Sequence, residues 1–136
     1  TGRDRVPEIF HSFEAHPFAP EYPGNGGKKR PSKIINSNGL TSNAAGRYQH
    51  MLAHWPHYRD LLNLPDFGPN SQDLWALQLI RERGALPLID MGSFELAVNR
   101  CKNIWASLPG ANYPGQPMHN ITKLQLAYLK AGGTVA

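Results

Sequence analysis

The 136-residue chain is long enough for one domain with its own hydrophobic core. It carries 14 Lys and Arg against 10 Asp and Glu, and the net charge of +4 favours an acidic or polyanionic partner without naming one. Charged residues make up only 18% and apolar residues 40%, which excludes a disordered acidic tail and a polybasic nucleic-acid arm. The single cysteine, Cys101, excludes an internal disulfide and a four-cysteine zinc site. No apolar run approaches the roughly 20 residues of a membrane span, and no signal peptide opens the chain.

Residues 1–42 contain too many Pro and Gly residues for a long helix. We predict loops with short strands at residues 8–13 and 32–36, and the Asn38-Gly39 pair indicates a turn after the second strand. Between the strands, residues 18–30 read as a long exposed loop that ends in a basic run.

From residue 41 onward the apolar residues follow a helical period. The pattern predicts helices from Ser42 or Asn43 to about residue 55, and over residues 57–63, 72–83, 94–102 and 121–131. Ser93 and Asn120 are the expected caps of the last two helices, and the helix over residues 72–83 is expected to be buried and central. The fold class is therefore α+β, with a small irregular β lobe over residues 1–42 and a mostly helical lobe over residues 43–136. Such a layout leaves a cleft between lobes, a frequent place for a polymer substrate.

Three histidines, His50, His54 and His57, lie four and three residues apart and raise the question of a metal site. His50 and His54 would share a helix face, but no Glu follows His50 as in the H-E-x-x-H motif. Pro56 also interrupts the helix before His57. We therefore expect solvated surface histidines and no metal.

The basic run Lys28, Lys29, Arg30 and Lys33 is expected to be a solvated loop or to attract a polyanion, either a nucleic acid or an anionic cell-wall polymer. The lack of aromatics within the run weakens the nucleic-acid reading. Cys101 lies on an apolar stripe and is expected to be a small buried hydrophobe. The chain has no nucleophile elbow, P-loop or dinucleotide motif, and its carboxylates are each expected to be surface charges: Glu8, Glu14, Glu21, Glu82 and Glu95.

Five ordered stretches give the chain a family resemblance. They are A-G-R-Y-Q at the end of residues 41–49, S-Q-D at residues 71–73, A-L-Q-L-I-R-E-R-G-A-L-P-L-I-D at residues 76–90, C-K-N-I-W-A-S-L-P-G-A-N-Y at residues 101–113, and A-G-G-T-V at residues 131–135. Upstream, residues 7–18 are similar to a small-lobe strand that ends in a His-Pro pair. Together they resemble the endolysins of the phage lambda type, which are lysozyme-like lytic transglycosylases.

The resemblance implies cleavage of the β-1,4 bond between N-acetylmuramic acid and N-acetylglucosamine in peptidoglycan. One Glu protonates the glycosidic oxygen and then acts as base while the C6 hydroxyl of the muramic acid attacks C1, which gives a 1,6-anhydro product. The family carries this Glu in a Glu-Gly-Thr motif at the end of an N-terminal helix. The chain contains no such motif, so we expect the helix and its Glu upstream of Thr1 and assign no catalytic residue.

The residues that the resemblance places at the substrate are Arg47, Tyr48, Gln49 and Tyr113. The Gln49 amide can donate to and accept from sugar N-acetyl and hydroxyl groups. Tyr48 is expected to face the sugar or to pack in the core, and Arg47 to meet a muramoyl or peptide carboxylate or to pair on the surface. Tyr113 lies in a Gly/Pro-rich loop that corresponds to a mobile lip, where an aromatic ring can stack on a sugar.

Two alternatives stay open beside lytic transglycosylation: a non-catalytic or degenerate domain that only binds cell-wall glycan, and a hydrolytic lysozyme. The resemblance implies a monomer without cofactor that acts on peptidoglycan glycan strands, with no nucleic acid or membrane as partner. It also implies that the protein accumulates in the host bacterial cytoplasm and reaches the periplasmic peptidoglycan after holin-mediated release.

Overall fold

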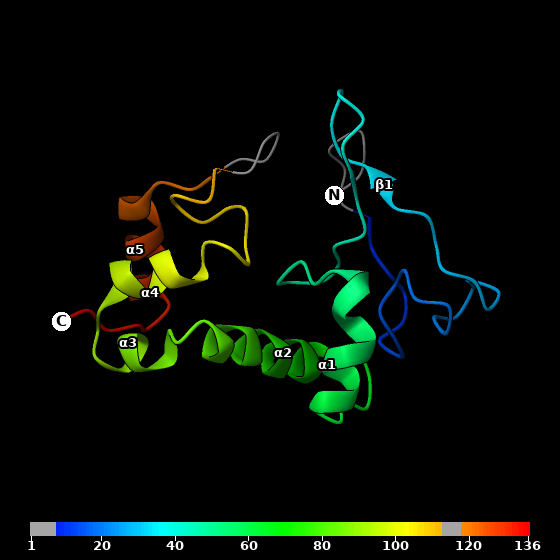
Figure 1. Cartoon of the computed structure of the whole chain (residues 1–136), viewed down its shortest axis with the longest axis horizontal. Helices are drawn as coiled ribbons and strands as arrows, with labels where there is room; N and C mark the ends of the chain where they lie inside the picture. Colours follow the sequence, from blue (N-terminus) through cyan, green and yellow to red (C-terminus); the bar gives the residue numbers. More distant parts are fainter. Residues whose placement is uncertain (1–7, 113–117) are drawn as a thin grey trace. The chain divides into compact units, whose positions relative to one another are not determined.

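The computed structural model describes residues 8–112 and 118–136, and these form five α-helices, one short 3-10 helix and two short strands (Figure 1). The chain divides into two compact units, Thr1–Ala76 and Leu77–Ala136, and the boundary falls within the longest helix. The mixture of helices with a small antiparallel sheet confirms the α+β class. The division into lobes at residues 42 and 43 stays a prediction.

Residues 8–32 of the first unit form loops, as their Pro and Gly content predicts. β1 (Lys33–Ile34) pairs with β2 (Thr41–Ser42) in an antiparallel register that sets Lys33 opposite Ser42. The turn between them is confirmed: the Asn36 side chain accepts hydrogen bonds from two backbone N–H groups, and Gly39 has a φ of 81°. The predicted strand at residues 8–13 is wrong, because no strand forms there.

The predicted helix from Ser42 or Asn43 to residue 55 is also wrong. Residues 44–50 form a turn instead, followed by η1 (Leu52–His54) and α1 (Trp55–Leu61). Gly46 and Gln49 have φ values of 80° and 53°, which a right-handed helix does not allow. Pro56 lies in the first turn of α1, where its missing N–H costs nothing, so the predicted second helix exists and starts slightly earlier.

The core of the first unit is an aromatic cluster around Phe67, which is fully buried. Trp55 meets the Phe67 ring edge-on, with centroids 5.6 Å apart, and His16 lies 5.0 Å away from it. Its other large buried members are Trp75, Phe18, Tyr58, Leu52 and Leu64. The cluster fixes the segment around residue 16, α1 and the start of α2 (Pro69–Glu82) within one body.

α2 matches the predicted helix over residues 72–83 but is not uniformly buried. Its buried side chains are those of Ser71, Gln72, Trp75 and Ala76, while Leu74 and Leu77 are about half exposed, at 51% and 48%. Polar residues at the beginning of the helix are therefore part of the interior.

The second unit has its own small core, made of Ala85, Ala97 and Cys101 with partly buried neighbours that include Trp105. α3 (Leu86–Asp90) precedes the predicted helices, which appear as α4 (Phe94–Cys101) and α5 (Ile121–Lys130). Asn120 caps α5 as predicted, accepting from the N–H of Thr122 at 2.8 Å, whereas the Ser93 side chain makes no capping bond. The expectation that Cys101 is buried is confirmed, and Trp105 packs against the same core.

No helix in the described part of the chain is long and apolar enough to cross a membrane. Nor do residues 8–112 and 118–136 gather three or more His, Cys, Asp or Glu side chains in a way that could hold a metal ion.

Candidate functional site

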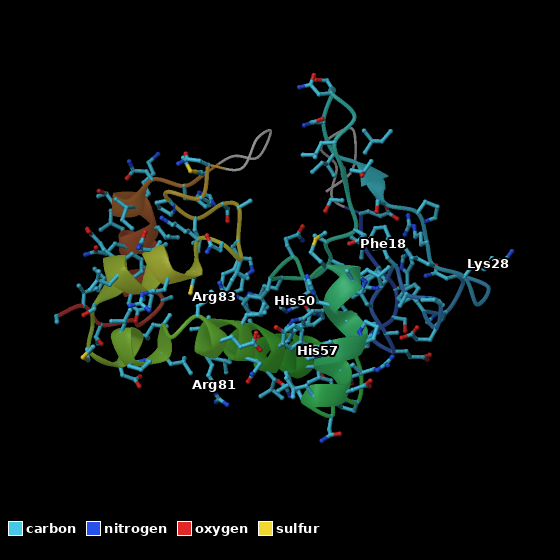
Figure 2. The ribbon with its side chains drawn as sticks, viewed as in Figure 1. Phe18, Lys28, His50, His57, Arg81 and Arg83 are labelled. Carbon is cyan, nitrogen blue, oxygen red and sulfur yellow. The ribbon has the colours of Figure 1, made fainter. Side chains whose placement is uncertain are left out.

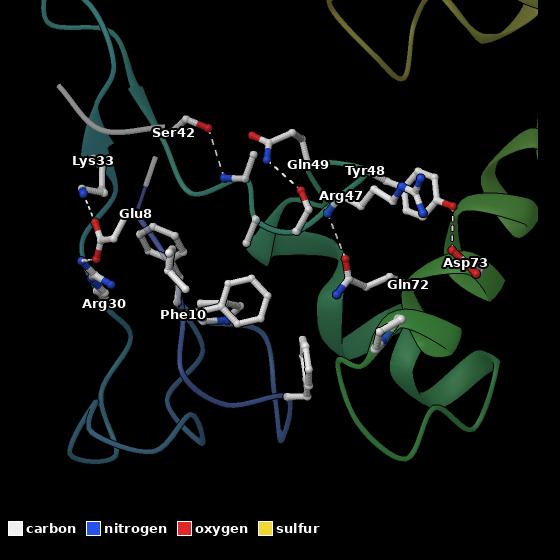
Figure 3. A pocket seen from close by; sticks show the side chains of 18 residues that line it. Glu8, Phe10, Arg30, Lys33, Ser42, Arg47, Tyr48, Gln49, Gln72 and Asp73 are labelled. Atoms are coloured by element: carbon white, nitrogen blue, oxygen red, sulfur yellow. Dashed lines mark hydrogen bonds and ion pairs between the residues drawn. The ribbon is translucent and has the colours of Figure 1, made fainter. Parts of the chain in front are cut away.

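A pocket of about 570 Å³ lies within the first unit and contains most of the residues that the sequence places at the substrate (Figure 3). Its walls come from residues 8–18, the β1–β2 sheet, the turn at residues 44–49 and the first turns of α2. The lining combines aromatic and aliphatic side chains with hydroxyl, amide, guanidinium and carboxylate groups. This volume and mixture are typical of sites for small polar organic ligands.

The turn at residues 44–50 carries three of the predicted residues, and backbone bonds close it at its base. Ala45 and His50 exchange both of their backbone hydrogen bonds, at 3.0 and 2.9 Å. Within the turn, the Gln49 N–H donates to the Gly46 carbonyl at 3.2 Å. A turn with two left-handed residues projects successive side chains to different sides, which a helix would not do.

The side chain of Gln72, near the start of α2, holds the turn at residues 44–50 in place through hydrogen bonds. Its Oε1 accepts from the Arg47 backbone N–H at 3.0 Å, and its Nε2 donates to the Phe67 carbonyl at 2.9 Å. Gly46 approaches the Gln72 amide so closely that a Cβ at position 46 would clash with Oε1. The buried Gln72 amide is thus satisfied at both ends and fixes the turn to α2.

Two buried histidines, His16 and His50, support the turn from the core side. The Nδ1 of His16 accepts from the Phe18 N–H at 3.2 Å, so its Nε2 carries the proton and donates to the His50 carbonyl at 2.7 Å. His50 in turn contacts the Gln72 carbonyl through Nε2 at 3.1 Å and stacks on Trp75, with ring centroids 3.9 Å apart and planes 2° apart. The hydrogen bond accepted at Nδ1 requires a neutral His16 ring.

Burial is the main cause of the shifted pKa values of both rings. It lowers the pKa of His50 from 6.5 to about 4 and also lowers the pKa of His16, in each case against an opposing hydrogen bond to a backbone carbonyl. The expectation of a solvated surface residue is therefore wrong for His50, which is 3% exposed and lies inside the first unit (Figure 2). His54 and His57 are exposed, as expected. The cause is a partner 22 residues away on α2, which the local pattern does not reveal.

Gln49 is exposed at the pocket wall, as expected of a substrate-binding amide. Its Nε2 donates to the Gly46 carbonyl at 2.9 Å, which orients the side chain. Its Oε1 has no hydrogen-bond partner among residues 8–112 and 118–136. An oriented acceptor is therefore available to a sugar hydroxyl or N-acetyl N–H group.

Arg47 and Tyr48 also line the pocket. The Arg47 guanidinium is exposed and forms no salt bridge within the described residues, so it is available to an anionic group. The Tyr48 hydroxyl donates to Asp73 Oδ1 on α2 at 2.6 Å, and this bond raises the pKa of the Tyr48 hydroxyl, with burial as the second cause. Tyr48 is half-buried and contributes to both the pocket wall and the packing, which leaves both of its expected roles in place.

The opposite side of the pocket carries Glu8 between two cations of the basic run (Figure 3). Glu8 accepts from Arg30 at 2.6 Å and forms a second ion pair with Lys33. The basic run is thus split: Arg30 and Lys33 share the Glu8 carboxylate at the pocket, while Lys28 and Lys29 are exposed on the loop.

Three further residues bear on the predicted site. Tyr113, the fourth predicted site residue, lies outside the described residues. Gln72 and Asp73 were not predicted as site residues, although the S-Q-D stretch that contains them was part of the family resemblance. The S-Q-D stretch therefore marks these two residues in the sequence, but it does not indicate what they do.

A second pocket of about 400 Å³ lies in the second unit between α4, α5 and residues 103–108. Its lining is almost entirely apolar, with side chains such as Ile89, Phe94 and Leu124. Because it offers few polar groups to orient a hydroxylated ligand, the first pocket is the better candidate for a polar substrate.

Comparisons with known proteins identify the family of the chain. The Endolysin family model matches residues 2–135. The chain is 52% identical over all of its 136 residues to the endolysin of Escherichia phage P2, and it covers 77% of that protein. It is 53% identical over 106 residues to the endolysin of Escherichia phage lambda, in an alignment that covers 77% of this chain and 66% of that protein. Among solved structures it is similar to the bacteriophage lambda lysozyme complexed with a chitohexasaccharide, with a TM-score of 0.81 and 45% identity, and to another structure of that lysozyme, with a TM-score of 0.76 and 43% identity. Each alignment covers 95% of this chain and 75% of the other. The α+β fold is therefore lysozyme-like.

Proposed function

Since the chain belongs to the endolysin family, we propose that it takes part in phage lysis by binding and cleaving the glycan strands of bacterial peptidoglycan. The observation that carries this proposal is the pocket at residues 44–49, where the oriented Gln49 amide and the exposed Arg47 guanidinium lie beside the Tyr48 ring. A related lysozyme is complexed with a chitohexasaccharide, a glycan built of the same kind of N-acetylated sugar.

The side chains of the pocket suit an alternating aminosugar polymer. Gln49 Oε1 can accept from an N-acetyl N–H or a ring hydroxyl, and the Tyr48 ring offers an apolar face to the C–H groups of a sugar. Arg47 supplies a positive charge for the lactyl or peptide carboxylate that distinguishes muramic acid from glucosamine. Together these groups bind and orient the strand.

The proposed reaction is lytic transglycosylation. A carboxylic acid donates its proton to the glycosidic oxygen as the bond from this oxygen to C1 breaks. The resulting carboxylate then takes the proton of the C6 hydroxyl while the C6 oxygen bonds to C1, which closes the 1,6-anhydro ring. We expect this acid to be the Glu of the family's Glu-Gly-Thr motif, which residues 1–136 do not contain. The two carboxylates that line the pocket, Glu8 and Asp73, are already engaged with Arg30 and Lys33 and with Tyr48.

The test is mass spectrometry of the fragments that the protein, expressed from its complete reading frame, releases from purified peptidoglycan. Anhydromuramic ends support transglycosylation, and reducing ends would assign the protein to the hydrolytic lysozymes instead. A protein that co-sediments with the wall but releases no fragments would instead be a non-catalytic glycan-binding domain. The same proposal places the protein in the host cytoplasm until holins give it access to the wall.

A further inference from the structure

Asp73 is a pocket residue whose carboxylate is only partly used by the protein. The residue is exposed on α2, and its Oδ1 accepts from the Tyr48 hydroxyl at 2.6 Å (Figure 3). Its Oδ2 has no hydrogen-bond partner in the part of the chain that the structure describes, although Asp73 lines the pocket. A carboxylate has several acceptor positions, so one of its oxygens can hold the tyrosine while the other binds a ligand.

The bond to Asp73 also decides where the Tyr48 ring lies. The backbone N–H of Arg47, the preceding residue, is anchored by Gln72, and the Tyr48 ring is tilted against His50 with centroids 5.7 Å apart. The hydroxyl end donates to Asp73 at a distance typical of a charge-assisted bond. Asp73 therefore aligns an aromatic ring and offers a carboxylate oxygen beside it.

We propose that Asp73 is a further substrate-binding residue of this pocket, which positions Tyr48 through Oδ1 and accepts a hydroxyl or amide hydrogen of the glycan through Oδ2. This inference rests on the proposed function and deepens it. The sugar at Asp73 is a neutral N-acetylglucosamine unit, because a carboxylate repels the lactyl carboxylate of muramic acid. The exposed Arg47 guanidinium is the better partner for that acid.

The link between Asp73 and Tyr48 has a readout that needs no ligand. Asp73 raises the pKa of the Tyr48 hydroxyl, first through the hydrogen bond and also through its charge. Asp73→Asn removes the charge and weakens the bond, so one tyrosine should ionise at lower pH in an ultraviolet absorbance titration. The signal should vanish from the titration of Tyr48→Phe, which assigns it among the five tyrosines.

The ligand readout is the affinity for chitohexaose, a neutral probe, measured by calorimetry on the protein from its complete reading frame. Loss of a hydrogen bond to a charged group predicts that Asp73→Ala weakens binding about tenfold or more. Asp73→Asn should weaken it less, since an amide oxygen can still accept. The matched control is Asp90→Asn, which changes an exposed carboxylate of α3 outside the pocket and should bind as the wild type does.

Asp73→Ala that keeps its melting temperature and binds chitohexaose as tightly as the wild type would overturn the inference while leaving the proposed function standing. An unchanged tyrosine titration in Asp73→Asn would overturn the positioning role. A wild-type protein that neither binds chitohexaose nor releases muropeptides would overturn the proposed function and this inference together.

Discussion

His50 makes the stability of the first unit depend on pH in a way that can be calculated from its surroundings. Its ring is 3% exposed, stacks on Trp75, and has a pKa of about 4 instead of 6.5, mainly because burial disfavours the charged form. Above pH 6.5 the ring is neutral in both the folded and the unfolded chain. As the pH falls from 6.5 towards 4, the unfolded chain binds a proton at His50 and the folded chain does not.

The free energy of unfolding should therefore fall with pH in this window. A difference of about 2.5 pKa units corresponds to about 3 kcal/mol, most of which is lost between pH 7 and pH 4. The pKa of His16 is lowered as well, so that ring adds to the loss in the same direction. A single group of this kind matters, because the whole stability of a domain is about 5–15 kcal/mol.

The assay is urea denaturation at pH 7 and pH 4 for the wild type, His50→Gln and the control His57→Gln. Glutamine keeps an N–H donor for the Gln72 carbonyl but cannot be protonated, so His50→Gln should lose about 3 kcal/mol less than the wild type between the two pH values. His57 is exposed on α1, and its replacement should leave the wild-type pH dependence unchanged. Equal losses in the wild type and His50→Gln would refute the assignment of a neutral buried ring.

Three further predictions concern single positions. Gly46→Ala should lower the free energy of unfolding by about 2 kcal/mol more than Gly39→Ala. Both positions have φ near 80°, but only a Cβ at position 46 would also clash with Gln72. Equal losses of stability in chemical denaturation would show that the contact between Gly46 and Gln72 is not tight. Gln49→Ala should lower the rate of muropeptide release about tenfold at an unchanged melting temperature, and an unchanged rate would remove Gln49 from the site. Cys101, whose pKa burial raises, should react with a thiol reagent much more slowly in the native protein than in urea, and equal rates would contradict its burial.

The sequence predicts the helices of the second unit well because their signals are local. Asn120 caps α5 through its own side chain, and the apolar spacing from residue 94 to residue 101 continues through the whole of α4. The turn at residues 44–50 shows where such signals fail. Tyr48, Met51, Leu52 and Trp55 have helical spacing, yet Met51 is 41% exposed and the chain takes left-handed conformations that periodicity does not register.

The candidate site shows the same limit. The resemblance brings Arg47, Tyr48 and Gln49 to one pocket wall. It could not reveal that Gln72 holds the Arg47 backbone or that Asp73 holds the Tyr48 hydroxyl, because these bonds span 25 residues of sequence. The polar residues of α2 carry no local signal of these roles, which come from the packing of α2 against the turn.

The claim that this pocket binds the glycan can be tested most directly by titrating the isotope-labelled protein with chitohexaose and following the backbone and side-chain resonances by nuclear magnetic resonance. We predict that the largest shifts fall on Arg47, Tyr48, Gln49 and Asp73, with the Gln49 side-chain amide among them. Shifts confined to α4 and α5, where the apolar pocket lies, would contradict the account.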